Sequence, residues 1–200
     1  MFQKIPASKN SLDQRKLIYG VGINDADYIT RIKVDGKKVT CPAYQKWLSM
    51  FVRCYSAKHH ERQPTYKGCK VCPEWLTFSK FASWYDVNNV DGWHLDKDIK
   101  SVGNKVYSAE NCLFVPPCIN AFLNDHAAKR GEYPQGVNFI NESGRFRARI
   151  TIDGKVNQIG CYDTPELARV AYVVAKNEEI KRKCEEFPQF AKYLIKHLLS

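Results

Sequence analysis

Apolar and polar residues alternate over residues 94–99, which predicts a strand with one polar face. Successive side chains of a strand point to opposite faces, so every second residue shares a face. The two sets are Leu95, Lys97 and Ile99 on one face, and His94, Asp96 and Asp98 on the other. The pattern therefore predicts one imidazole and two carboxylates on the same side of this strand.

A short strand pair and a helix are predicted after this segment, within residues 105–115 and beyond. Pro116–Pro117 cannot continue a strand, whereas a proline suits the first turn of a helix. Asn120 would lie on that helix. A strand pair backed by a helix can bring Asp96, Asp98 and Asn120 together, and their oxygens are hard ligands of the kind that Mg²⁺ takes.

Earlier in the chain, the apolar pattern predicts a hairpin and two helices. Residues 28–39 read as a hairpin with its turn at Asp35–Gly36. A helix over about 42–56 has an apolar stripe at spacings of three and four. The residues of this stripe are Trp47, Met50, Phe51 and Cys54. The helix that begins at Pro73 carries aromatic residues at helical spacing, which are more typical of a core than of a base-stacking platform.

A second alternation, over residues 145–152, predicts a strand with a row of arginines. Phe146, Ala148, Ile150 and Ile152 would face inward, and Arg145, Arg147, Arg149 and Thr151 outward. Asp153–Gly154 is a type I′ hairpin signal, followed by a partner strand from Lys155 and a helix that begins near Pro165. The open face of such a sheet is often merely solvated. It can also enter the DNA major groove, and three arginines without an intervening acidic residue favour DNA.

These elements predict an α+β fold with two modules. Small and charged residues over 127–132 mark the best boundary, which gives one module at 1–130 and a second at 131–200 that includes a C-terminal helix.

The composition favours a polyanionic partner. The chain of 200 residues has 31 Lys and Arg against 21 Asp and Glu, a net charge of +10. No apolar run approaches the ~18 residues of a membrane span, and the N-terminus has no apolar signal region. We therefore expect double-stranded DNA as partner, no membrane association and a cytoplasmic location.

Eight cysteines would be compatible with disulfides, but without a secretion signal we expect free thiols. Cys69 and Cys72 have metal-ligand spacing, and Cys54 lies near them in the sequence. A structural zinc site normally pairs two such half-sites. Zinc therefore stays an alternative, with buried thiols as the simpler interpretation.

Several short motifs around the first strand resemble the core of phage-encoded HNH endonucleases, which contain a ββα-metal finger. The motifs are Leu95-Asp96-Lys97-Asp98-Ile99, Asn104-Lys105, Tyr107-Ser108, Asn111-Cys112, Phe114-Val115-Pro116 and Ile119-Asn120. The resemblance implies Asp96 or Asp98 as the acidic residue, Asn111 as the middle Asn and Asn120 as the ligand on the helix. It also implies Mg²⁺ or Mn²⁺ as cofactor.

The sequence departs from that family at the general base. Lys97 or Asp98 stands where the family has a histidine directly after the acidic residue, and His94 precedes it on the same face. The catalytic candidates are therefore His94, Asp96, Lys97, Asp98 and Asn111, with Asp96, Asp98 and Asn120 as metal ligands. Asp98 is an alternative base to His94, and Asn111 would orient the base or its loop.

The second module resembles the AP2-type DNA-binding domain over about 133–184. The likeness is carried by Gly136-Val137, the run from Arg145 to Ile150, Ile159-Gly160, Thr164-Pro165-Glu166, Ala168 and Ala171-Tyr172. It implies that Arg145, Arg147 and Arg149 contact DNA. We add Lys155 of the partner strand, and Arg53, which shares a helix face with Lys46, as further DNA-binding candidates.

Together the two resemblances imply a DNA endonuclease of the homing type that acts in the cytoplasm of an infected bacterium. One metal per finger predicts nicking by a monomer, whereas a double-strand cut would require a homodimer or two events. Two alternatives stay open: a sequence-specific DNA-binding protein with an impaired catalytic core, and a zinc-stabilised nucleic-acid-binding module.

Overall fold

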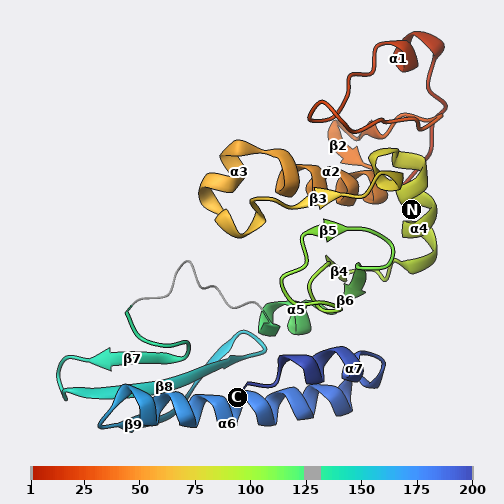
Figure 1. Cartoon of the computed structure of the whole chain (residues 1–200). Coiled ribbons are helices and arrows are strands. Elements are labelled where there is room, and N and C mark those ends of the chain that lie inside the picture. Colours follow the sequence, from red (N-terminus) through yellow and green to blue (C-terminus); the bar gives the residue numbers. More distant parts are fainter. Residues whose placement is uncertain (1, 124–131, 200) are drawn as a thin grey trace. The chain divides into compact units, whose positions relative to one another are not determined.

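The chain has a mixed α+β fold made of helices and four small sheets among the residues that the computed structural model describes, 2–123 and 132–199. It divides into two compact units, Met1–Phe114 and Val115–Ser200. The division follows Phe114, earlier than the boundary expected after residue 130, and the segment 124–131 lies outside the described residues. Helix α5 (Pro117–Leu123) therefore belongs to the second unit (Figure 1).

The first unit contains short helices and strands that are joined by ordered loops (Figure 1). Its elements, with the strand β6 that crosses the boundary, are α1 (Lys9–Asp13), β1 (Arg31–Val34), β2 (Lys37–Thr40), α2 (Pro42–Tyr55), α3 (Ala57–Arg62), η1 (Pro64–Tyr66), β3 (Lys70–Val71), η2 (Glu74–Leu76), α4 (Phe78–Asn88), β4 (His94–Asp96), β5 (Val106–Tyr107) and β6 (Leu113–Val115). Strand β1 pairs with β2, β3 pairs in parallel with β5, and β4 pairs with β6.

An aromatic core holds the first unit together. The predicted stripe of α2 is confirmed, since Trp47, Met50, Phe51 and Cys54 are all buried. The Trp47 indole also donates a hydrogen bond of 2.7 Å to the Trp75 carbonyl, so its only polar atom is satisfied. This packing fixes the orientation of α2, and with it the polar residues on the other face of the helix.

The strand predicted over 94–99 is shorter than expected. It ends at Asp96, because the Asp96 carboxylate accepts the backbone amides of Asp98 and Ile99 and turns the chain there. The alternation of burial nevertheless continues through the turn. The buried residues are Leu95, Lys97 and Ile99, while His94, Asp96 and Asp98 keep contact with solvent.

The second unit is a three-stranded antiparallel sheet covered on one face by a long helix (Figure 1). Its further elements are β7 (Val137–Ile140), β8 (Arg145–Ile152), β9 (Lys155–Tyr162), α6 (Pro165–Glu186), η4 (Pro188–Phe190), α7 (Ala191–Leu194) and η5 (Ile195–His197). The predicted turn is present, with positive φ at Asp153 and Gly154. The expected C-terminal helix begins at Pro188, since α6 continues to Glu186, and its turns η4, α7 and η5 follow one another directly to His197.

Two close contacts fix α6 on the sheet. Gly136 has a φ of +83°, and a Cβ there would lie 2.0 Å from the Tyr172 ring, so only glycine fits. At the β8–β9 turn, the fully buried Lys183 ammonium bridges Asp153 of the turn and Glu179 of α6, at 3.1 and 3.3 Å. The helix is thus tied to the sheet at the start of β7 and at the β8–β9 turn, which leaves the opposite sheet face open.

None of the helices within the described ranges has the length and apolar character that a bilayer crossing requires.

Candidate active site and nucleic-acid interface

The polar residues of β4 lie near a cationic face of α2. Lys46 and Arg53 are seven residues apart on that helix, and the Lys46 ammonium donates a hydrogen bond of 3.1 Å to the carbonyl of Trp93, the residue that leads into β4. Partial loss of solvent lowers the pKa of His94, and the charges of Lys46 and Arg53 lower it further. The imidazole is therefore neutral near neutral pH, and a neutral imidazole can accept a proton.

Asp96 is half-buried and held in one orientation. One of its carboxylate oxygens accepts hydrogen bonds from the backbone amides of Asp98, at 2.8 Å, and Ile99, at 2.7 Å. Burial raises the pKa of Asp96 above its usual value, and these two amides only partly offset the effect. An asparagine could accept the same amide bonds without a buried charge, so local stability does not require a carboxylate here.

Arg53 supplies a permanent positive charge beside Asp96. Its guanidinium donates a long hydrogen bond of 3.4 Å to the Tyr107 hydroxyl and lies 5.7 Å from the centre of the Tyr66 ring. Burial works against the charge, but Tyr107, Tyr66 and Asp96 together outweigh it and raise the pKa of Arg53. Arg53 thus adds a positive charge that lowers the pKa of His94, and its phosphate contact stays a prediction.

Lys97 and Asp98 form an ion pair instead of a reactive pair. The Lys97 ammonium donates to both Asp98 oxygens, at 2.6 and 2.7 Å, and to the Asn104 carbonyl at 2.6 Å. The Lys97 side chain is 7% exposed and that of Asp98 46%. Asp98 therefore neutralises a buried cation, which makes it less suited to act as a base or a metal ligand than Asp96.

Two asparagines fix the loop between β4 and β6. Asn104 donates to the carbonyls of Lys97, at 3.0 Å, and Val106, at 2.8 Å. Asn111 donates to the same Val106 carbonyl at 3.3 Å. Asn111 therefore contacts this loop, and its role in orienting the base or the loop stays a prediction. Asn104 was expected only as part of a motif, although an asparagine between two predicted strands is a signal for such a role in a loop.

Asn120 lies on α5, in the second unit. Its backbone amide donates to the Pro116 carbonyl at 3.1 Å, as expected at the first turn of a helix. At the end of α5, the Phe122 carbonyl accepts a hydrogen bond from Lys176 of α6. This contact within the second unit explains why α5 is grouped with the sheet module.

The cysteines of the zinc alternative are present as thiols. All eight cysteines are free, and burial raises the pKa of the Cys54 thiol to about 12 and also raises that of Cys72. Within the ranges that the structure covers, no three His, Cys, Asp or Glu side chains gather in a way that could hold a metal ion.

The arginine row of β8 lies on the open face of the sheet, but its members differ. Arg145 donates to the Asp163 carboxylate at 3.0 Å and to the Cys161 carbonyl at 2.9 Å. Arg147 makes one long hydrogen bond of 3.5 Å to Asn138. Arg149 is exposed, and its guanidinium forms no hydrogen bond or ion pair with the described residues.

The strand register places Asn138 and Gln158 on the same open sheet face as the arginines, and Lys155 on the opposite face. Opposed residues of antiparallel strands share a face, so Asn138 lies beside Arg147, and Gln158 beside Arg149. Both amides lie among residues that carry no signal in the sequence, because only the strand pairing brings them beside the arginines. Lys155 is opposite Ile152, so it is on the side of the sheet that α6 covers, at its exposed edge.

The chain matches no family model, no curated protein and no solved structure.

Proposed function

We propose that this chain is a metal-dependent DNA endonuclease that hydrolyses phosphodiester bonds. The proposal is carried by the hydrogen bond from Lys46 of α2 to Trp93, the residue before β4, and is supported by the charges of Lys46 and Arg53, which act on the pKa of His94. Two cations, a neutral imidazole and a carboxylate are the groups that phosphodiester hydrolysis uses.

Each group has a separate role in this reaction. Lys46 and Arg53 contact the oxygens of the scissile phosphate and favour the charge that develops on them. His94 accepts the proton of the attacking water, since its lowered pKa keeps the imidazole neutral. Asn104 and Asn111 hold the loop that follows β4 in place.

The proposal takes Asp96 as the one carboxylate ligand of a divalent cation that keeps several waters, since the described residues form no cluster of three acidic, His or Cys ligands. Burial disfavours the charge of this carboxylate, and a bound cation would compensate for it. Mg²⁺ or Mn²⁺ at this position would stabilise negative charge on the phosphate and on the leaving oxygen. Asn120 stays a predicted further ligand on the strength of the family resemblance.

The open sheet face of the second unit would select the DNA sequence. Arginine pairs with the edge of guanine, and asparagine and glutamine pair with the edge of adenine, in the major groove. Arg147 and Arg149 next to Asn138 and Gln158 present these groups on one surface.

A plasmid-nicking assay with Mg²⁺, with Mn²⁺ and with EDTA tests the proposal. We expect metal-dependent nicking by the wild type and its loss in Asp96→Asn, which keeps the acceptor for the amides of Asp98 and Ile99. Asp86→Asn, at an exposed position of the first unit, is the matched control and should retain activity. Thermal unfolding of Asp96→Asn should be unchanged or shifted upward. Equal nicking by Asp96→Asn and wild type would contradict the role of Asp96.

A DNA-binding protein without nuclease activity is the second candidate. The observation that favours it is the ion pair of Asp98 with Lys97, which occupies one of the two predicted carboxylates. It predicts DNA binding by the wild type, with no nicking in either metal.

A further inference from the structure

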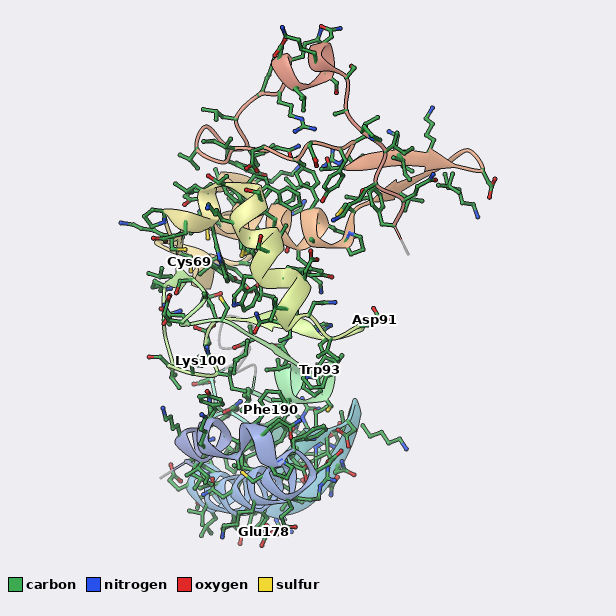
Figure 2. The ribbon with its side chains drawn as sticks, turned by 90° about the vertical axis from the view of Figure 1, so that its right-hand side faces the viewer. Cys69, Asp91, Trp93, Lys100, Glu178 and Phe190 are labelled. Atoms are coloured by element: carbon green, nitrogen blue, oxygen red, sulfur yellow. The ribbon has the colours of Figure 1, made fainter. Side chains whose placement is uncertain are left out.

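The β1–β2 hairpin carries three basic residues on one face. The register places Lys33 directly opposite Lys38 and Arg31 opposite Thr40, so Arg31, Lys33 and Lys38 point to the same side. The other face contains Ile32, which is buried, and Val34, Val39 and Lys37. In Figure 2 the hairpin projects from the rest of the first unit, at the upper right.

This arrangement is unfavourable for the hairpin alone. Like charges that lie directly opposite each other on antiparallel strands destabilise the pair. In the part of the chain that the structure describes, no carboxylate forms an ion pair with Arg31, Lys33 or Lys38. Arg31 lies 5.7 Å from the centre of the Tyr44 ring, whereas Lys33 and Lys38 extend into solvent. A bound polyanion would convert the repulsion into attraction.

We propose that the β1–β2 hairpin is a DNA-contacting ribbon whose Lys33 and Lys38 bind backbone phosphates. This proposal rests on the proposed function for its choice of partner, and it adds a contact surface outside the predicted active site and the β8 sheet. Lysine ammonium groups are compact point charges suited to phosphate oxygens, so the ribbon contributes affinity and not sequence selection. A two-stranded ribbon also fits the DNA major groove, which is about 12 Å wide.

The salt dependence of DNA binding is the measurement that isolates this surface. The logarithm of the binding constant falls with the logarithm of salt concentration by about 0.9 per phosphate contact on duplex DNA. The full chain is titrated against a labelled DNA duplex in EDTA, over a series of KCl concentrations, so that cleavage does not interfere. The variant is Lys33→Gln/Lys38→Gln. Its matched control, Lys9→Gln/Lys80→Gln, removes the same charge from exposed positions of the first unit.

We expect the salt slope of the hairpin variant to become shallower by about 1.8, the value for two lost phosphate contacts. The control should keep nearly the wild-type slope. If the salt slope of the hairpin variant becomes shallower by no more than that of the control, the proposal that the hairpin contacts DNA is wrong. Tryptophan fluorescence should show equal or higher thermal stability for the hairpin variant, because the repulsion between Lys33 and Lys38 is removed.

The same samples distinguish this proposal from the nuclease. Wild type that fails to nick plasmid in Mg²⁺ or Mn²⁺, together with a shallower slope in the hairpin variant, would contradict the nuclease and support the ribbon. Normal nicking by the wild type, together with an unchanged salt slope in the hairpin variant, would support the nuclease and contradict the ribbon.

Discussion

Charged side chains around β4 are enclosed, whereas those of β8 face solvent. In the first unit, Asp96 and Arg53 are half-buried, and burial contributes to the pKa shifts of His94, Asp96 and Lys46. In the second unit, Arg149 is exposed on a flat sheet. Proton transfer benefits from a shifted pKa, while groove recognition requires charges that reach outward. Under the proposed nuclease function, the first region would serve the chemical step and the second the recognition of DNA.

Replacing His94 should show the largest difference in nicking between variants of the first unit and variants of the second. We expect His94→Gln to reduce metal-dependent nicking about 100-fold or more, the lower range for loss of a general base. DNA affinity should change little, because the imidazole is neutral. The matched variant in the other region is Arg149→Ala, for which nicking at saturating protein should stay near wild type. Equal losses of nicking in His94→Gln and Arg149→Ala would contradict the assignment of catalysis to the first unit and DNA recognition to the second.

Loss of the buried cation should destabilise the first unit specifically. Lys97→Met leaves the Asp98 carboxylate and the Asn104 carbonyl without their donor, which should lower the unfolding free energy by about 2 kcal/mol. All four tryptophans lie in the first unit, so urea unfolding followed by tryptophan fluorescence reports that unit.

Lys80→Met is the control for this change, since Lys80 is exposed, and it should stay within about 0.5 kcal/mol of wild type. A similarly small effect for Lys97→Met would show that the ion pair does not stabilise the fold.

The pH dependence of nicking should follow His94. Its folded-state pKa is lowered, so the active neutral form persists to a pH below the usual value of about 6.5 and is lost as pH falls further. Nicking rates should then decrease by up to about tenfold per pH unit on the acid side. The same protonation favours the unfolded chain, so this residue also lowers stability as pH falls. In His94→Gln the acid limb due to this group should be absent, and its persistence would assign it to another residue.

The arginines of the β8 row should differ from one another in how much DNA affinity they contribute. Arg149→Ala should weaken DNA binding by about 1–3 kcal/mol, as expected for one base or phosphate contact, without changing unfolding of the first unit. Arg145→Ala should cost less affinity, because Arg145 is already bonded to Asp163 and Cys161. Fluorescence anisotropy with one duplex gives both values, and a larger loss for Arg145 would reverse the ranking.

Local patterns determined the elements of this protein and the residue types at its surfaces. The apolar stripe of α2, the alternation of β8 and the Asp153–Gly154 turn all follow from spacing and turn chemistry, and each is present. The polar set of His94, Asp96 and Asp98 also followed from a period of two. These features depend on neighbours in the sequence, which is why the sequence determines them.

The tertiary structure decided how the charges are paired. Asp96 and Asp98 look equivalent in the sequence, but one accepts backbone amides and the other neutralises Lys97. Lys46 meets β4 only because the aromatic core orients α2, and Gln158 meets Arg149 only through strand register. Burial and pairing depend on residues distant in the chain, so the protonation states and partners of these side chains are set by the fold.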